Sequence, residues 1–241
     1  MPEPLNSDRM PEKQDISSRI LDATATLLVR WGYSKITMDD IAKQAGVAKA
    51  TVYLRWKTRE ALFGALMKRE RLECAQDIRQ RITTDPAGTT LRGLLKHSAL
   101  ALMQRPVLKA ALLRDMEMLG KWAHHERSGV TYMERLVGFK TYLEVLREQQ
   151  LVRVDLSLQA QVFMFSAIFM GFFLVAPLMP DEFTPSDEEM AELMAETVHR
   201  SLEPEHAASP AALQTVSHTF QQYLDRVLEI MQEQFQQEMK S

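Results

Sequence analysis

The most informative part of the sequence is residues 37–56, TMDDIAKQAGVAKATVYLRW. Thr37, followed three residues later by Asp40, predicts a capping box at the start of a helix. Gly46 permits the tight turn that ends this helix, and a short second helix is expected over residues 49–54. The stretch therefore predicts two helices joined by a glycine turn.

The two predicted helices have the features of a helix-turn-helix that binds duplex DNA. Ala42 and Ala45 are small enough to let the helices approach closely, so the second helix can lie in the major groove. Residues 43–59 contain five basic residues and no acidic one, a patch that attracts polyanions. The alternative is a small helical bundle with Tyr53 and Trp56 in its core, but it leaves the coincidence of turn and basic patch unexplained.

Candidate DNA contacts follow from positions on the second helix. Lys49, at its start, could donate to guanine O6 or N7, and Ala50 or Leu54 could contact a thymine methyl group. Tyr53 is better placed to contact a phosphate. The same holds for Lys57 and Arg59, which follow the second helix, and for the backbone amides at Thr37. The full set of candidates is Tyr33, Thr37, Lys49, Ala50, Thr51, Tyr53, Leu54, Arg55, Lys57 and Arg59.

Composition and charge indicate a globular protein with one basic end. The net charge is −3, yet the first 60 residues carry 10 Lys and Arg against 8 Asp and Glu, which suits binding of a polyanion at one end only. The single Cys74 allows no internal disulfide, which fits a reducing compartment. Residues 1–15 lack the apolar region of a signal peptide. We therefore expect a cytoplasmic protein.

Helical rather than alternating periodicity runs along the whole chain and predicts an all-α fold. Expected helices span 16–31, 37–45, 49–54, 58–82, 89–104, 106–119, 126–149, 156–178, 186–203 and 209–239. We assign residues 1–15 to a flexible N-terminal arm, 16–62 to a three-helix helix-turn-helix domain, 63–204 to a larger helical body, and 205–241 to an additional C-terminal amphipathic helix.

Residues 162–179 form a segment apolar enough to require comparison with a membrane-spanning helix. Ser166, Gly171 and Pro177 interrupt it, and no cluster of Lys and Arg marks a cytoplasmic side. A buried helix is therefore the preferred interpretation, and we expect no membrane partner.

Met and Phe are abundant between residues 91 and 180. Such side chains are typical both of ordinary core packing and of an adaptable pocket for an apolar ligand, and the two interpretations stay open for each residue. The pocket candidates are Met103, Met116, Leu119, Trp122, Met133, Phe139, Phe165 and Phe169.

Enzymatic and metal-binding chemistry has little support in the sequence. His124, His125 and Glu126 are adjacent, so on a helix they would diverge by about 100° per residue and would not share a metal ion. Neither a catalytic triad nor a phosphate-binding loop is recognisable. We expect no catalytic residues, no metal and no cofactor.

The last predicted helix carries a narrow apolar stripe. Its members alternate in steps of three and four residues, the spacing of a coiled-coil seam: Leu213, Val216, Phe220, Tyr223, Val227 and Ile230. Such a stripe needs a partner, either the body of the same chain or a second subunit, and the sequence does not choose between them.

Residues 20–63 resemble the TetR family of bacterial repressors. The resemblance is carried by Gly32-Tyr33, Thr37, Asp40-Ile41-Ala42, Ala45-Gly46-Val47 and the string KATVYLRWKTREALF at residues 49–63. That string resembles the family's recognition helix and the start of its fourth helix. Ala48 departs from the common Ser or Thr cap, and Ala50 from the common Gly, so we expect the short helix to be less well capped.

The resemblance implies a homodimer on a palindromic operator, with residues 63–204 as a ligand-binding and dimerisation domain. It also implies that helices 156–178 and 186–203 form the dimer bundle. We therefore expect a transcriptional repressor that a small apolar effector releases from its operator. The alternative is a constitutive or architectural DNA-binding protein whose body serves only assembly, and ligand-dependent release would separate the two.

Overall fold

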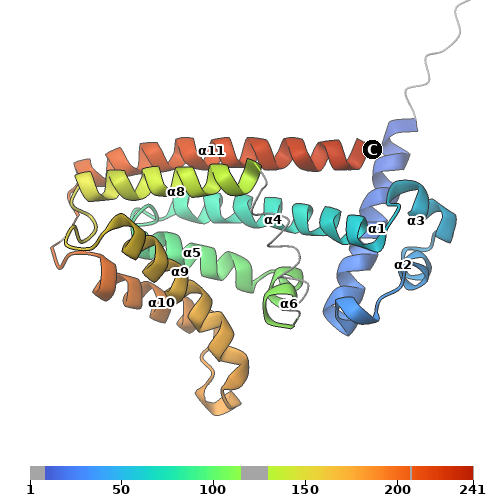
Figure 1. Cartoon of the computed structure of the whole chain (residues 1–241), viewed down its shortest axis with the longest axis horizontal. Helices are drawn as coiled ribbons and strands as arrows, with labels where there is room; N and C mark the ends of the chain where they lie inside the picture. The colour runs from blue at the N-terminus through green and yellow to red at the C-terminus, as the bar shows by residue number, and fades with distance from the viewer. Residues whose placement is uncertain (1–8, 115–129, 207, 241) are drawn as a thin grey trace, which may run out of the picture. The chain divides into compact units, whose positions relative to one another are not determined.

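Every regular element in the described part of the chain is a helix, as the periodicity predicts (Figure 1). The structure, a computed structural model, describes residues 9–114, 130–206 and 208–240, with side chains over 16–111, 137–206 and 208–239. It divides into an N-terminal unit (Met1–Arg71 with Gln232–Ser241) and a body (Leu72–Met231). The all-α prediction is confirmed within the described residues.

The N-terminal unit is built from three complete helices and the first part of a fourth. These are α1 (Arg9–Trp31), α2 (Met38–Ala45), α3 (Lys49–Arg55) and the first part of α4 (Arg59–Thr84), with a 3-10 turn η1 (Tyr33–Lys35) after α1. Each helix contributes fully buried apolar side chains: Ile20, Leu21, Ile41, Val52, Leu62 and Leu66. Trp56, directly after α3, also packs in this core and is 3% exposed.

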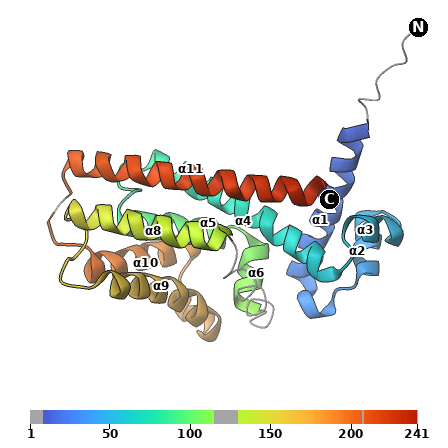
Figure 2. The ribbon, with the colours of Figure 1, turned by 45° about the horizontal axis from the view of Figure 1, so that its top comes forward.

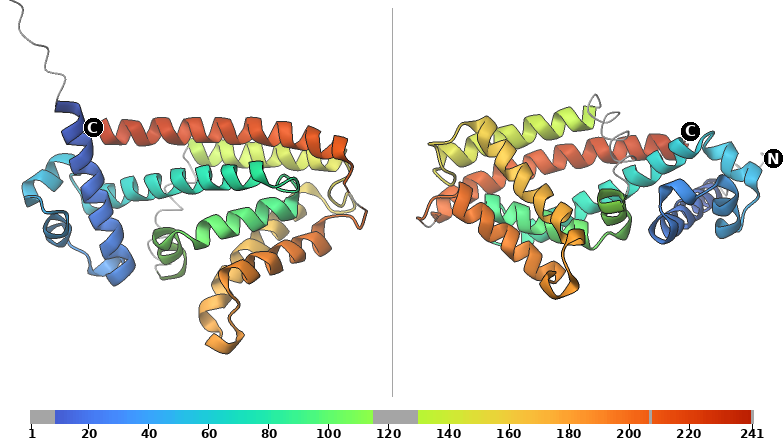
Figure 3. Two further views of the ribbon diagram at one scale, coloured as in Figure 1. Left: turned by 180° about the vertical axis from the view of Figure 1, so that it is seen from behind. Right: turned by 60° about the horizontal axis from the view of Figure 1, so that its bottom comes forward.

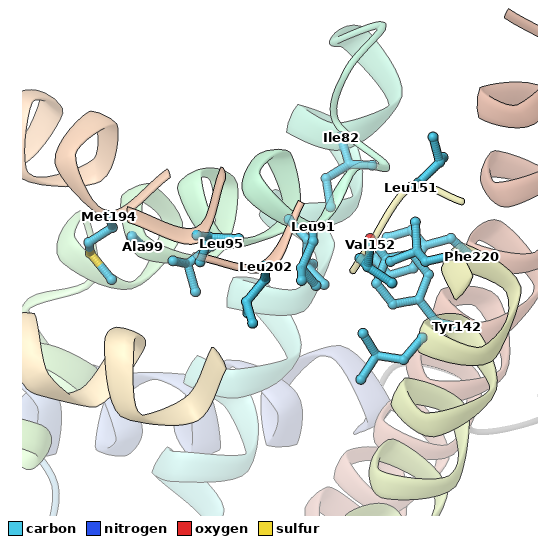
Figure 4. Packing of buried hydrophobic residues seen from close by; sticks show 14 of the residues in the cluster. Ile82, Leu91, Leu95, Ala99, Tyr142, Leu151, Val152, Met194, Leu202 and Phe220 are labelled. Atoms are coloured by element: carbon cyan, nitrogen blue, oxygen red, sulfur yellow. The ribbon is translucent and has the colours of Figure 1, made fainter. Parts of the chain in front are cut away.

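The body contains the rest of α4 and six further described helices (Figure 2). They are α5 (Leu91–Met103), α6 (Pro106–Arg114), α8 (Val130–Glu148), α9 (Leu158–Val175), α10 (Asp187–Leu202) and α11 (Pro210–Lys240), with 3-10 turns η2 (Ala176–Leu178) and η3 (Asp181–Phe183). α5 packs chiefly on α10. The shared core includes the fully buried Tyr142 and Phe220 (Figure 4). The fully buried Phe173 belongs to the same core.

The α4–α5 connection is fixed by close packing. A Cβ at Gly88 would lie 2.6 Å from the Ile82 carbonyl oxygen, so only glycine fits there. The buried Tyr142 hydroxyl donates to the Thr89 carbonyl at 2.8 Å. His97 Nε2 lies 2.8 Å from Asp85 Oδ2. The break between the predicted helices 58–82 and 89–104 is therefore a closely packed, hydrogen-bonded corner of the body.

α11 packs on its own chain, which answers the question left open by its apolar stripe. Phe220 is fully buried, with its ring centroid 4.7 Å from that of Tyr142 on α8. A Cβ at Gly138 would clash with the Tyr223 ring, so the two antiparallel helices approach very closely (Figures 1 and 2). Burial of these apolar side chains against the body of the same chain stabilises the packing of α11.

α9 corrects the expectation of a buried apolar helix at residues 162–179. Only Gln161 and Phe173 of α9 are buried, whereas Phe163 is 74% exposed. By length and composition, Leu158–Leu178 is the one described segment that could cross a membrane, and 11% of its most apolar stretch of 18 residues is buried. α9 runs beside α10 (Figure 3), and because most of its side chains are apolar, packing within one chain leaves part of its apolar surface uncovered.

Candidate DNA-binding site

α2 begins with a complete capping box. The Thr37 hydroxyl accepts from the Asp40 amide at 3.2 Å, and the Asp40 carboxylate accepts from the Thr37 amide at 3.0 Å. The Thr37 hydroxyl also lies 2.6 Å from that carboxylate as a donor. These bonds satisfy the amides that a helix start leaves unpaired, and they lower the pKa of Asp40. The predicted start of the helix-turn-helix is therefore confirmed.

Gly46 ends α2 in the left-handed conformation, with φ 65° and ψ 40°. Its amide bonds back to the end of α2, and the Val47 amide donates to the Ala42 carbonyl at 3.0 Å. Arg19 of α1 donates through Nη2 to the Ala45 carbonyl at 2.7 Å. The turn is thus held both by its own backbone and by a side chain from α1, and this fixes the direction in which α3 leaves.

α3 has one anchored face and one exposed face. Val52 is fully buried, and Trp56 directly after the helix is 3% exposed. On the other side, Lys49, Ala50, Tyr53 and Leu54 are exposed, and Leu54 reaches 72%. Residues at these spacings share one side of a helix. Ala48 occupies the N-cap without a side-chain hydrogen bond, so the predicted weak cap is confirmed.

Lys49 has an acidic partner in this structure. Its Nζ lies 3.0 Å from Asp39 Oδ2 in the first turn of α2, and 6.0 Å from the centroid of the Tyr53 ring. The bond to Asp39 raises the pKa of Lys49, so the ammonium stays charged at neutral pH.

Tyr33 and Arg59 brace the turn between α1 and α2. Arg59 Nη1 donates to the Ile36 carbonyl at 3.1 Å, and its guanidinium lies 4.3 Å from the Tyr33 ring centroid. The Tyr33 hydroxyl donates to Glu60 at 3.4 Å, while its ring meets Phe63 edge-on. Burial raises the pKa of Tyr33. Both side chains thus stabilise the fold of the turn, and the phosphate contact expected of Arg59 and the DNA contact expected of Tyr33 stay predictions.

The remaining predicted contacts differ in how accessible they are to DNA. Lys57 is exposed, whereas Thr51 and Arg55 are half-buried on the flanks of α3. The Thr37 hydroxyl is engaged in the capping box. The structure thus brings Lys49, Ala50, Tyr53 and Leu54 together on one surface, which we call the α3 face.

The pocket candidates are only partly within the described residues. Phe139 and Phe165 have ring centroids 5.1 Å apart, and Phe169 lies 5.1 Å from Phe173. These three candidates are partly buried against the body core, and Met103 is 4% exposed within it. Met116, Leu119 and Trp122 lie outside the described residues, as does the side chain of Met133.

In the described residues, no three His, Cys, Asp or Glu side chains gather as a metal site would require. The cluster at residues 124–126 falls outside that part of the chain.

Two residues of the site were missed by the sequence reasoning. Arg19 and Asp39 act on partners 26 and 10 positions away along the chain. Neither spacing is a helical or hairpin repeat, so only the folded arrangement of α1, α2 and α3 could have identified them.

The family model described as "Bacterial regulatory proteins, tetR family" matches residues 20–66, which spans α2, α3 and the start of α4. An uncharacterized HTH-type transcriptional regulator of Mycobacterium tuberculosis is 26% identical over 125 residues, 52% of this chain and 59% of the relative. The fatty acid metabolism regulator protein of Bacillus subtilis is 35% identical over 80 residues, 31% of this chain and 40% of that protein. The chain thus spans less than two thirds of the length of these relatives.

A solved structure extends the likeness to the body. SmeT, the repressor of the Stenotrophomonas maltophilia multidrug efflux pump SmeDEF, superposes with a TM-score of 0.60 at 21% identity, over 81% of this chain and 96% of SmeT. A structure of SmeT described as a complex with triclosan gives a TM-score of 0.60 over 80% of this chain and 95% of SmeT, at 19% identity. At these identities the likeness concerns the fold.

Proposed function

Because the chain belongs to the TetR family of bacterial regulatory proteins, we propose that it is a homodimeric repressor, released from a palindromic operator by a small apolar effector. The observation that carries the proposal is the α3 face, which is exposed while Val52 and Trp56 anchor the opposite side. A short helix held in this way can enter the major groove with its N-terminal residues nearest the bases. From DNA as the proposed target we infer a cytoplasmic location.

Leu54 offers a direct test of the α3 face. It is 72% exposed, so Leu54→Glu should fold normally while repelling phosphates and removing an apolar base contact. Fluorescence anisotropy with operator duplex should then register no binding. Val154→Glu is the matched control, because Val154 is a 62% exposed side chain of the body. Equal loss of binding in both variants, or in neither, would contradict the assignment.

Dimerisation is supported by the apolar surface of α9 and its surroundings. α9 contains no Asp, Glu, Lys or Arg. Its exposed side chains continue into the turns that follow and onto α10: Phe163, Met170, Leu174, Val175, Leu178, Met179, Phe183 and Leu193. Monomeric proteins rarely leave such a surface in water. A second copy that presents the same surface would cover it in an isologous two-fold contact.

Sedimentation measures the proposed dimer. Wild type should sediment as a dimer, and Phe163→Glu should give monomers because it buries an unpaired charge in the contact. Val137→Glu, at a 55% exposed position on α8, should remain dimeric. A monomeric wild type would refute the dimer, and a membrane-associated fraction of the protein would favour a spanning role for α9.

The proposed effector rests on the aromatic groups of the body. Phe139, Phe165 and Phe169 come from two helices and lie partly buried at the edge of the core. Aromatic walls of this kind suit an apolar ligand. The triclosan complex of SmeT is a further reason to test small aromatic compounds.

Ligand-dependent release can be measured on labelled operator. Aromatic compounds, lipophilic cations and fatty acyl derivatives should raise the operator Kd by about 5- to 150-fold when they prefer the low-affinity state. Phe169→Trp should obstruct the pocket and reduce this shift, whereas Val154→Trp adds the same ring at an exposed position and should not. If compounds bind without any change in operator Kd, the protein is a constitutive DNA-binding protein.

A further inference from the structure

A negative charge on α2 lies next to Lys49, the main hydrogen-bond donor of the α3 face. Asp39 Oδ2 lies 3.0 Å from Lys49 Nζ, and the side chains are 52% and 53% exposed. Asp39 lies in the first turn of α2, where the helix dipole stabilises a carboxylate. A fixed negative charge on a surface that approaches DNA weakens binding to phosphates. A role for Asp39 in DNA binding must therefore be sought in something other than overall affinity.

DNA offers Lys49 two kinds of hydrogen-bond acceptor, negatively charged phosphate oxygens and neutral base edges. A lysine ammonium has three donor hydrogens, so Lys49 can bond Asp39 and still donate to a second acceptor. A phosphate oxygen bound by Lys49 would lie close to the Asp39 carboxylate, and the two negative charges would repel each other. Guanine O6 and N7 are neutral acceptors, and the carboxylate does not penalise them in this way.

We propose that Asp39 is a specificity-determining residue, which directs the ammonium group of Lys49 toward neutral base acceptors and away from backbone phosphates. The inference rests on the proposed binding of DNA by the α3 face. Specificity is a difference between two affinities, and a repulsive group that weakens non-specific binding raises it. Asp39 acts through Lys49 and is therefore a positioning residue for the base contact.

The expected effect follows from counterion release. Without the carboxylate, Lys49 can neutralise about one more phosphate on non-operator DNA, which steepens the slope of log K against log salt by about 0.9. At 0.1 M salt, one such contact raises the affinity for random-sequence DNA by about 8-fold. Operator affinity should rise less, because Lys49 already donates to a base there. The ratio of operator to random-DNA affinity should therefore fall several-fold.

The experiment measures anisotropy of random-sequence and selected operator duplexes between 50 and 200 mM salt. The variants are Asp39→Asn, Asp39→Glu, Lys49→Ala and the double variant Asp39→Asn with Lys49→Ala. Asp225→Asn is the matched control, because Asp225 pairs with Arg79 in the body at 2.8 Å and similar exposure. It changes the net charge equally without altering the α3 face.

Asp39→Asn should bind random DNA more tightly with a steeper salt slope, Asp39→Glu should behave as wild type, and Asp225→Asn should not change. The increase should vanish in the double variant. An increase that persists without Lys49 would mean general repulsion and would overturn the positioning role, as would an Asp39→Asn variant indistinguishable from wild type on both duplexes. If wild type binds neither duplex, it is the proposed DNA-binding function that fails.

Discussion

Gly46 controls the angle between α2 and α3, and alanine there should destabilise the N-terminal unit. Its φ of 65° lies in the left-handed region, which costs a residue with a Cβ about 1–2 kcal/mol. Alanine also restricts the unfolded chain, which offsets about 0.4–1 kcal/mol. The added Cβ would lie 3.2 Å from Arg19 Nη2, which caps the end of α2. A net loss of about 1 kcal/mol is expected for Gly46→Ala.

Gly64 is the matched control, because the same substitution there should have the opposite sign. It lies within α4, where an added Cβ has no neighbour within 4 Å, so Gly64→Ala should stabilise by about 0.5–1 kcal/mol. Two of the three tryptophans, Trp31 and Trp56, belong to this unit, so urea unfolding followed by tryptophan fluorescence, with Trp122→Phe as the common background, reports on it. With a slope of about 1 kcal/mol/M, Gly46→Ala should lower the midpoint by about 1 M. An unchanged midpoint for Gly46→Ala, beside a raised one for Gly64→Ala, would refute the reasoning.

Three further changes test other parts of the structure. Ala48→Ser should stabilise the N-terminal unit by about 1 kcal/mol, because the N-cap of α3 has no side-chain acceptor; no rise in the urea midpoint would contradict this. Tyr142→Phe should cost about 1–3 kcal/mol in thermal unfolding of the body, because it leaves the Thr89 carbonyl unpaired in the core; an unchanged Tm would show that the corner does not depend on this bond. Bonds from Thr37 hold the pKa of Asp40 below its usual range, so its contribution is present above about pH 4 and is lost as the pH falls through the folded-state pKa. The stability difference between wild type and Asp40→Asn should therefore shrink on acidification, and a constant difference would exclude the linkage.

Local features of the fold could be predicted from the sequence because their causes are local. The capping box at Thr37 and the turn at Gly46 depend on residues within one or two helical turns. The predicted start of α1 at residue 16 was wrong, because the helix begins at Arg9 and includes residues 9–15, which the sequence analysis assigned to the flexible arm on their Pro and charged residues. The surface on which the α11 stripe packs could be identified only in the structure, because an apolar stripe packs equally well on the body of its own chain and on a second subunit.

In the site, too, local features could be predicted from the sequence, whereas contacts between separate helices could not. Exposure of Lys49, Ala50 and Leu54 follows from helical spacing around the buried Val52. The pairing of Lys49 with Asp39 and the bracing by Arg59 depend on distances between separate helices. The exposed surface of α9 was mistaken for core because apolar composition alone does not state which chain covers it.

Selection of duplex DNA from a random pool with the purified protein tests the central claim most directly. The account predicts two inverted half-sites with centres about one or one and a half helical turns apart. Lys49→Ala should lose the preference at one position in each half-site, while Tyr53→Phe should weaken all sequences nearly equally because a phosphate contact carries no base information. A pool without enriched sequences, or an enriched site unchanged by Lys49→Ala, would contradict the reading of DNA by the α3 face.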